Sequence, residues 1–175
     1  MKRALHTVSI IAVLLLAPVI SAFKPAPPPK KITYSDESKP AVKLELRTDG
    51  WRVKSARVLG EKKPVRWKVA PDLPATAVVD AATRRVVLLG GYGDGCADLG
   101  KIAVYDFSGK LLESINLTTV IEGLEEVSRE YTKICCPCRW VHDTGVESGE
   151  LTINVCDSTR AIVSLAKPAL RVESP

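Results

Sequence analysis

The chain has 175 residues, of which 46% are hydrophobic and 26% are charged, and its 25 basic and 20 acidic side chains give a formal net charge of +5. This length is sufficient for one domain with a hydrophobic core. The charge falls from +5 to +3 if Lys2 and Arg3 are removed with a leader, which is not the balance of a nucleic-acid-binding protein. The sequence therefore predicts no nucleic-acid partner.

The first 22 residues have the pattern of a secretory signal peptide. A short basic start, Met1-Lys2-Arg3, precedes an apolar run over residues 8–20, which ends in Ser21-Ala22. The run is shorter than the ~20 apolar residues of a comfortable membrane span, so cleavage after Ser21 or Ala22 is expected, with a retained anchor as the alternative. The pattern predicts a secreted or periplasmic protein.

Residues 23–40 are expected to form a linker between this leader and a single domain over residues 41–175. The stretch Lys24-Pro-Ala-Pro-Pro-Pro-Lys-Lys31 contains too much proline for a helix or a central strand. Such a sequence favours an extended polyproline II conformation, which spaces a folded domain away from a surface.

From residue 41 the chain has the alternation of a β protein. Val42, Leu44 and Leu46 alternate with charged residues, which is the period of a half-buried strand. Further strands are predicted over residues 51–58, 64–69, 77–79, 86–89, 102–105, 111–115, 140–141, 151–155 and 161–165. We expect a mainly β fold: an antiparallel meander, propeller-blade-like or sandwich-like, with one short helix near residues 119–128. The helix is indicated by the capping-box pair Thr119 and Glu122.

A basic segment covers residues 43–68. It holds nine basic residues (Lys43, Arg47, Arg52, Lys54, Arg57, Lys62, Lys63, Arg66 and Lys68) and three acidic ones (Glu45, Asp49 and Glu61). Solvated strand faces explain such a segment, because lysine and arginine are nearly always exposed. The alternative is a patch for anionic cell surfaces such as lipid head groups or wall polymers.

Residues 77–117 resemble a propeller blade. Arg85-Val-Val-Leu-Leu-Gly-Gly-Tyr92 is followed by Ile102-Ala-Val-Tyr-Asp106 and Ser108-Gly109-Lys110, which is similar to a kelch repeat. With its Gly91-Tyr-Gly-Asp94 loop, the stretch also resembles bacterial secreted proteins of unknown function that carry one blade-like unit. The resemblance implies β-sheet topology and no particular ligand, since a single blade cannot close a ring.

The five cysteines Cys96, Cys135, Cys136, Cys138 and Cys156 all follow the leader, so disulfides are their default chemistry after export. We expect one bridge from Cys96 and one from Cys156 to the cluster at 135–138, which leaves one thiol. That thiol could link two chains as a dimer. Two alternatives remain: a redox Cys135–Cys138 pair, or a metal site formed by Cys135, Cys138 and His142 with Cys96 or Cys156 as a fourth ligand.

No catalytic or cofactor-binding residues are identified. His142 is the one histidine that remains after removal of the leader, and its neighbour Asp143 should point to the opposite face of a strand. The sequence favours a non-enzymatic binding or structural module without a cofactor, held by disulfides, with an unknown protein or cell-surface partner. The alternatives are a thiol–disulfide or metal-handling protein, and a binder of anionic surfaces through residues 43–68.

Overall fold

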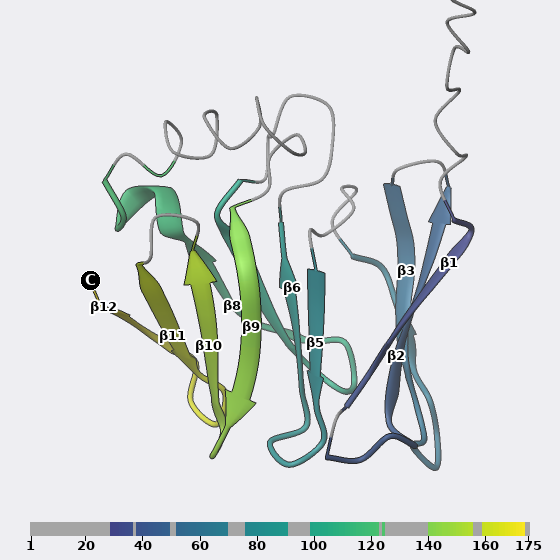
Figure 1. Cartoon of the computed structure of the whole chain (residues 1–175). Helices are drawn as coiled ribbons and strands as arrows, with labels where there is room; N and C mark the ends of the chain where they lie inside the picture. Colours follow the sequence, from purple (N-terminus) through teal and green to yellow (C-terminus); the bar gives the residue numbers. More distant parts are fainter. Residues whose placement is uncertain are drawn as a thin grey trace, which may run out of the picture.

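The computed structural model describes residues 29–36, 38–49, 52–69, 76–90, 99–122, 124, 140–155 and 159–173. Within them the fold is three four-stranded antiparallel sheets that stand side by side in chain order (Figure 1). Each sheet is a simple meander in which consecutive strands are hydrogen-bonded neighbours. The expectation of a mainly β, antiparallel fold is confirmed.

The first sheet, called the basic sheet below, contains β1 (Lys31–Ser35), β2 (Lys43–Asp49), β3 (Arg52–Leu59) and β4 (Arg66–Trp67). The middle sheet contains β5 (Thr76–Asp80), β6 (Arg85–Leu89), β7 (Lys101–Asp106) and β8 (Leu111–Asn116). The third sheet contains β9 (Val141–Glu147), β10 (Glu150–Val155), β11 (Arg160–Ser164) and β12 (Ala169–Glu173). The middle sheet covers nearly the same residues as the kelch-like stretch, which lies between two sheets of the same meander topology.

The middle sheet is apolar on both faces because its strands are nearly continuous runs of hydrophobic residues. On β6, Val86 and Leu88 face the basic sheet, whereas Val87 and Leu89 face the third sheet. Two separate cores result, one in each space between neighbouring sheets. This is the arrangement expected of blade-like units, which bury their faces on their neighbours.

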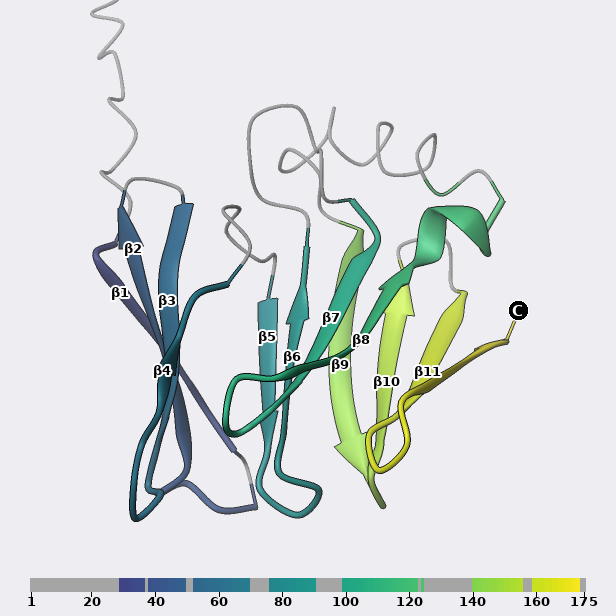
Figure 2. The same cartoon turned by 180° about the vertical axis from the view of Figure 1, so that it is seen from behind.

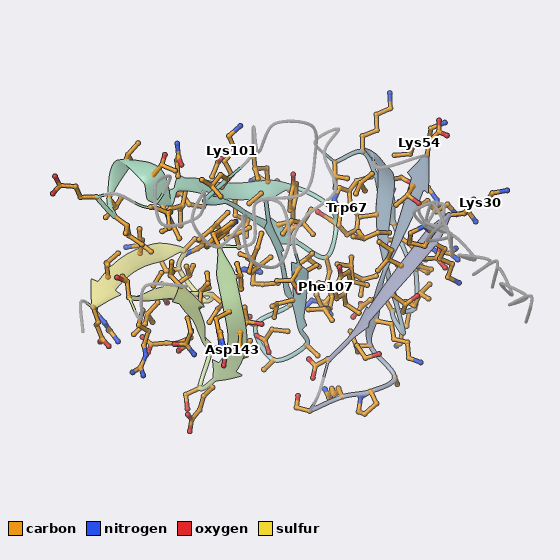
Figure 3. All side chains as sticks on the ribbon, turned by 45° about the horizontal axis from the view of Figure 1, so that its top comes forward. Lys30, Lys54, Trp67, Lys101, Phe107 and Asp143 are labelled. Atoms are coloured by element: carbon orange, nitrogen blue, oxygen red, sulfur yellow. The ribbon has the colours of Figure 1, made fainter. Side chains whose placement is uncertain are left out.

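Aromatic side chains form part of the core between the basic sheet and the middle sheet. Figure 3 shows Trp67 and Phe107 between the basic sheet and the middle sheet, and both are buried. Tyr105 lies next to Trp67, with ring centroids 6.2 Å apart. Gly109 has φ +86°, and a Cβ at that position would overlap the Trp67 indole. The turn after β7 therefore needs glycine both for its backbone conformation and for this close approach.

Polar contacts between turns also join the three sheets. Arg84, in the turn before β6, makes a two-pronged ion pair with Glu61 at 3.0 Å for each nitrogen–oxygen pair. The Arg84 guanidinium also lies 5.0 Å from the centroid of the Phe107 ring. On the other side, Arg85 Nε donates a hydrogen bond of 3.1 Å to the carbonyl of Leu165. Neighbouring sheets are thus connected by side chains as well as by the two cores.

One sequence expectation needs correction. Strand β1 lies inside the expected linker of residues 23–40, and all five of its residues pair with β2. The proline-rich composition masked a strand in which only Ile32 and Tyr34 pack on the core. The folded part therefore includes residues before 41.

The expected helix near 119–128 lies mostly outside the described residues and stays a prediction. The chain forms a 3-10 helix, η2 (Leu117–Thr119), capped by Asn116, whose side-chain oxygen accepts a hydrogen bond of 3.2 Å from the Thr118 amide. Thr119 lies inside this element rather than at its N-cap. Leu124 is helical and buried, and residues 123 and 125–130 lie outside the described part of the chain.

Figure 2 shows the reverse side of the sheets, with β4 and β8 as outer edge strands. Across the described ranges, no helix has the length and apolar character needed to cross a membrane.

Candidate functional site

The outward face of the basic sheet gathers charged side chains around one buried carboxylate. Strand alternation turns Leu44 and Leu46 to the core and Glu45 to the opposite face. The strand register places Thr33 and Arg57 directly across from Glu45 on the neighbouring strands, and Arg66 across from Arg57. The basic face, as we call it below, carries five cations: Lys31, Lys43, Arg47, Arg57 and Arg66.

Glu45 is the centre of an ion-pair network in which each basic partner comes from a different strand of the sheet. Lys31 Nζ lies 2.8 Å from one carboxylate oxygen, and Arg57 Nε lies 2.9 Å from the other. Arg47 and Arg66 each lie 3.7 Å from Glu45. The Glu45 side chain is only 2% exposed, so its carboxylate is nearly sealed from solvent within this set of cations.

The network strongly favours the charged form of Glu45. The hydrogen bond from Lys31 is the largest influence and that from Arg57 the next, and together they lower the pKa of Glu45 from 4.5 to about 2. Burial opposes ionisation without reversing this result. At neutral pH the carboxylate is therefore ionised, and the basic face retains a surplus of four positive charges.

The remaining residues of the basic segment lie elsewhere. Lys54 pairs with Asp49 at 2.7 Å, and both are largely exposed. Lys62 and Lys63 are exposed in the turn after β3, and Lys68 is exposed after β4. The sequence indicated a basic stretch, but it did not indicate that Lys31 joins it from β1. That contribution requires the pairing of β1 with β2.

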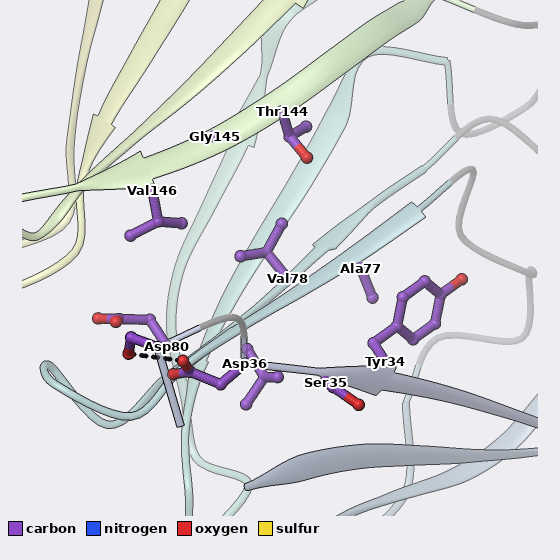
Figure 4. A pocket seen from close by; sticks show the side chains of 11 residues that line it. Tyr34, Ser35, Asp36, Ala77, Val78, Asp80, Thr144, Gly145 and Val146 are labelled. Carbon is purple, nitrogen blue, oxygen red and sulfur yellow. Dashed lines mark hydrogen bonds between the residues drawn. The ribbon is translucent and has the colours of Figure 1, made fainter. Parts of the chain in front are cut away.

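A second feature is a pocket of about 550 Å³ at the place where the first strands of all three sheets meet. Figure 4 shows Val78 of β5 opposite Thr144 and Val146 of β9, with Tyr34 and Ser35 of β1 completing the wall. The pocket has both polar and apolar walls. It lies beside the open edges of three strands that each pair on one side only.

Two buried carboxylates close one end of this pocket. Asp36, 4% exposed, accepts hydrogen bonds from the Ala81 amide at 2.5 Å, the Ser38 hydroxyl at 2.7 Å and the Lys39 amide at 2.8 Å. Burial is the largest single influence on Asp36 and raises its pKa, yet these hydrogen bonds together bring the pKa below its ordinary value. Asp80, 6% exposed, accepts hydrogen bonds from the amide and hydroxyl of Thr83. Both carboxylates thus hold turns, and the bond to Ala81 ties β1 to the middle sheet.

Of the sequence-predicted metal and redox residues, His142 alone lies in the part of the chain that the structure describes. His142 lies on β9 and its side chain is 70% exposed, with Nδ1 3.7 Å from the nearer Asp143 carboxylate oxygen. That separation is longer than a hydrogen bond. Asp143 instead accepts a hydrogen bond from the Asn154 side chain. Cys96, Cys135, Cys136, Cys138 and Cys156 lie outside the described residues, so the disulfide, redox, metal and dimer hypotheses stay predictions.

No other group suggests a metal centre in the described ranges. These residues contain no cluster of three or more histidine, cysteine, aspartate or glutamate side chains arranged to hold an ion. Residues 1–22, which have the signal-peptide pattern, also lie outside the described part, so both the signal peptide and export stay predictions.

Comparison with known proteins assigns neither a family nor a function to the chain. No protein-family model matches the chain, and no curated protein matches it. Among solved structures, the chain is similar to the crystal structure of HIRA(644-1017), with a TM-score of 0.49 and 14% sequence identity. The alignment covers 86% of this chain and 39% of that chain, so the protein spans about two-fifths of that structure's length.

Proposed function

We propose that this protein is an exported, non-enzymatic binding module that engages phosphate-bearing anionic surfaces through its basic face. The observation that carries the proposal is the surplus of four positive charges on one face of a four-stranded sheet, around the buried carboxylate of Glu45. A concentration of one sign of charge on a flat face attracts polyanions and accelerates their encounter. The signal-peptide pattern supports an extracytoplasmic setting for such a surface.

The internal carboxylate supports a binding role in a specific way. Five cations on one sheet face would repel one another, and Arg57 and Arg66 lie directly opposite on paired strands, which is unfavourable for like charges. Glu45 offsets this repulsion by contacting Arg47, Arg57, Arg66 and Lys31 at once. The face is thereby held in a defined arrangement while most of its charge stays available to a ligand.

The proposal is tested by co-sedimentation of the full chain with lipid vesicles. We expect binding to vesicles that contain phosphatidylglycerol, weak binding to vesicles of phosphatidylcholine alone, and loss of binding as salt rises, because exposed charges are screened. Soluble polyphosphate serves as a competitor. Competition by polyphosphate indicates that phosphate charge in any polymer suffices, whereas its failure indicates that the lipid surface is recognised.

A matched pair of double variants localises the effect. Lys43→Gln with Arg47→Gln removes two cations from the basic face, whereas Arg160→Gln with Lys167→Gln removes the same two residue types from exposed positions near the third sheet. Each basic residue near an anionic membrane contributes about 1 kcal/mol. We therefore expect the first pair to weaken vesicle binding at least tenfold at low salt and the second pair to have a small effect. Equal losses in the two pairs, or equal binding to neutral vesicles, would contradict the proposal.

A further inference from the structure

The outer edges of the three sheets are protected against pairing with another chain. Strand β4 has only two residues, β8 has a bulge at Leu112 opposite Val104 and Tyr105, and β12 carries Arg171 and Glu173. Short strands, bulges and charged side chains are the devices by which proteins prevent unwanted strand addition. Of the inner edges, which face the pocket, β1 begins with Lys31 and β9 has a register shift at His142.

Strand β5 lacks these protections. Its sequence is Thr-Ala-Val-Val-Asp, without lysine, arginine or proline, and all five of its residues pair with β6 without a bulge. Its single charged side chain, Asp80, is buried at the end of the strand and bonded to Thr83. Of the six edge strands in the described part of the chain, β5 is therefore the least defended. One row of its backbone amides and carbonyls is directed away from β6.

The open edge of β5 borders the pocket, which provides space for a ligand. Ala77, Val78, Val79 and Asp80 all line the pocket, and β9 provides the opposite wall (Figure 4). The volume of about 550 Å³ lies within the range of small-ligand sites. A Cβ atom added at Gly145 on β9 would contact nothing within 4 Å, so this stretch of the wall is open.

The side chains around the edge provide sites for alternate residues of an extended ligand. Val78 is half-buried, and Val146 is one of the large hydrophobic residues that stay exposed, at 38%. Tyr34 borders the same space from β1. The Asp36–Ala81 hydrogen bond fixes one end of the pocket. Main-chain hydrogen bonds along an edge combined with pockets for alternate side chains are the basis of strand-addition binding.

We propose that β5 binds an extended peptide segment of another protein, which adds to the middle sheet as an extra strand inside the pocket. The ligand is a short peptide of β-branched and small polar residues without proline. The binding energy comes from main-chain hydrogen bonds to β5 and from apolar contacts with Val78 and Val146. This site is separate from the basic face and independent of its function.

The test uses a library of blocked hexapeptides drawn from Val, Ile, Thr, Tyr and Ser, screened against the full chain by fluorescence anisotropy. We expect members with Kd below about 1 mM, the weak end of measurable recognition. The best peptide is then compared with two versions methylated on alternate backbone nitrogens, one for each edge of the extended peptide. Methylation keeps the side chains but removes the donors along one edge, so we expect at least tenfold weaker binding for the version blocked on the edge that faces β5 and a smaller effect for the other.

Two variants fill the pocket from opposite walls: Val78→Trp on β5 and Thr144→Trp on β9. Leu111→Trp, at an exposed position of β8 away from the pocket, is the matched control. We expect both pocket variants to weaken peptide binding at least tenfold and the control to keep it, with thermal melts confirming the fold. Thr144→Trp decides the question if Val78→Trp does not fold. The proposal is overturned if no peptide binds, if both methylated peptides bind as well as the parent peptide, or if the folded pocket variants bind as the parent protein does.

Discussion

Replacement of Glu45 by glutamine should move stability and anion binding in opposite directions. The change keeps the size of the side chain and removes its charge, so four basic side chains lose their common partner. The folded protein should become less stable because those cations then repel one another. The positive surplus on the basic face rises from four to five, so binding to anionic vesicles should become tighter.

The size of the stability loss follows from the pKa of Glu45. A decrease from 4.5 in the unfolded chain to about 2 in the fold corresponds to about 3 kcal/mol. Lys31 and Arg47 are more than half exposed, so solvent screening reduces this upper limit. We expect Glu45→Gln to lose about 1–2 kcal/mol of unfolding free energy at pH 7, after that reduction.

The pH dependence gives an independent check on the sign. Because the folded pKa lies below the unfolded value, the contribution of Glu45 is fully present above about pH 4.5 and disappears as the pH falls toward 2. The wild type should therefore lose more stability than the variant between pH 6 and pH 3. Urea unfolding followed by tryptophan fluorescence measures both proteins at both pH values.

Glu113→Gln on β8 is the control, because Glu113 is exposed and its carboxylate accepts a hydrogen bond from the adjacent Ser114 amide. It should leave both stability and vesicle affinity nearly unchanged. We expect Glu45→Gln to bind anionic vesicles about fivefold more tightly, from about 1 kcal/mol for one unit of charge. If Glu45→Gln kept the stability and pH dependence of the wild type, or bound vesicles more weakly, the reasoning about this network would be refuted.

Two further substitutions and one thiol count test other parts of the chain. Gly109→Ala should destabilise the protein by about 1–3 kcal/mol, because the new Cβ overlaps the Trp67 indole and φ is positive, and a thermal melt measures the shift. Asp36→Asn should lower the free energy of unfolding by about 1–3 kcal/mol, because it weakens the hydrogen bond to the Ala81 amide. The change should be visible as faster amide hydrogen exchange at Ala81. Unchanged exchange would contradict the role of this hydrogen bond. Intact mass after alkylation without reduction should count one free thiol among the five cysteines, whereas three or more, or bound zinc or copper, would contradict the expected pair of disulfides.

The sequence was sufficient to predict most strands but not the number of sheets. Runs such as Val86-Val-Leu-Leu89 are apolar at every position, which indicates a strand buried on both faces. The edge strands β1 and β12 carry only two partly buried hydrophobic residues each, Ile32 and Tyr34 or Leu170 and Val172. Adjacent prolines obscured that weak alternation, so both strands were missed, and with them the four-stranded pattern of the first and third sheets.

The candidate sites were less predictable because they depend on register. The charge of residues 43–68 is visible in the sequence, but its arrangement around Glu45 requires the pairing of β2 with β1, β3 and β4. The pocket is assembled from segments near residues 34–38, 77–80 and 144–146, which only the packing of three sheets brings together. No local motif identifies such a site.

The two-sided middle sheet determines how a stack of this kind can become longer. The outward faces of both end sheets are charged, with the cations around Glu45 at one end and the ion pairs of Arg171 with Glu150 and Glu173 at the other. A fourth sheet added outside either end would have to dehydrate these charges without gaining apolar contacts. A duplicated β5–β8 unit inserted next to the original would meet apolar surfaces on both sides. Duplication of a sheet could therefore lengthen the stack if the new sheet is inserted inside it, but not if the new sheet is added at either end.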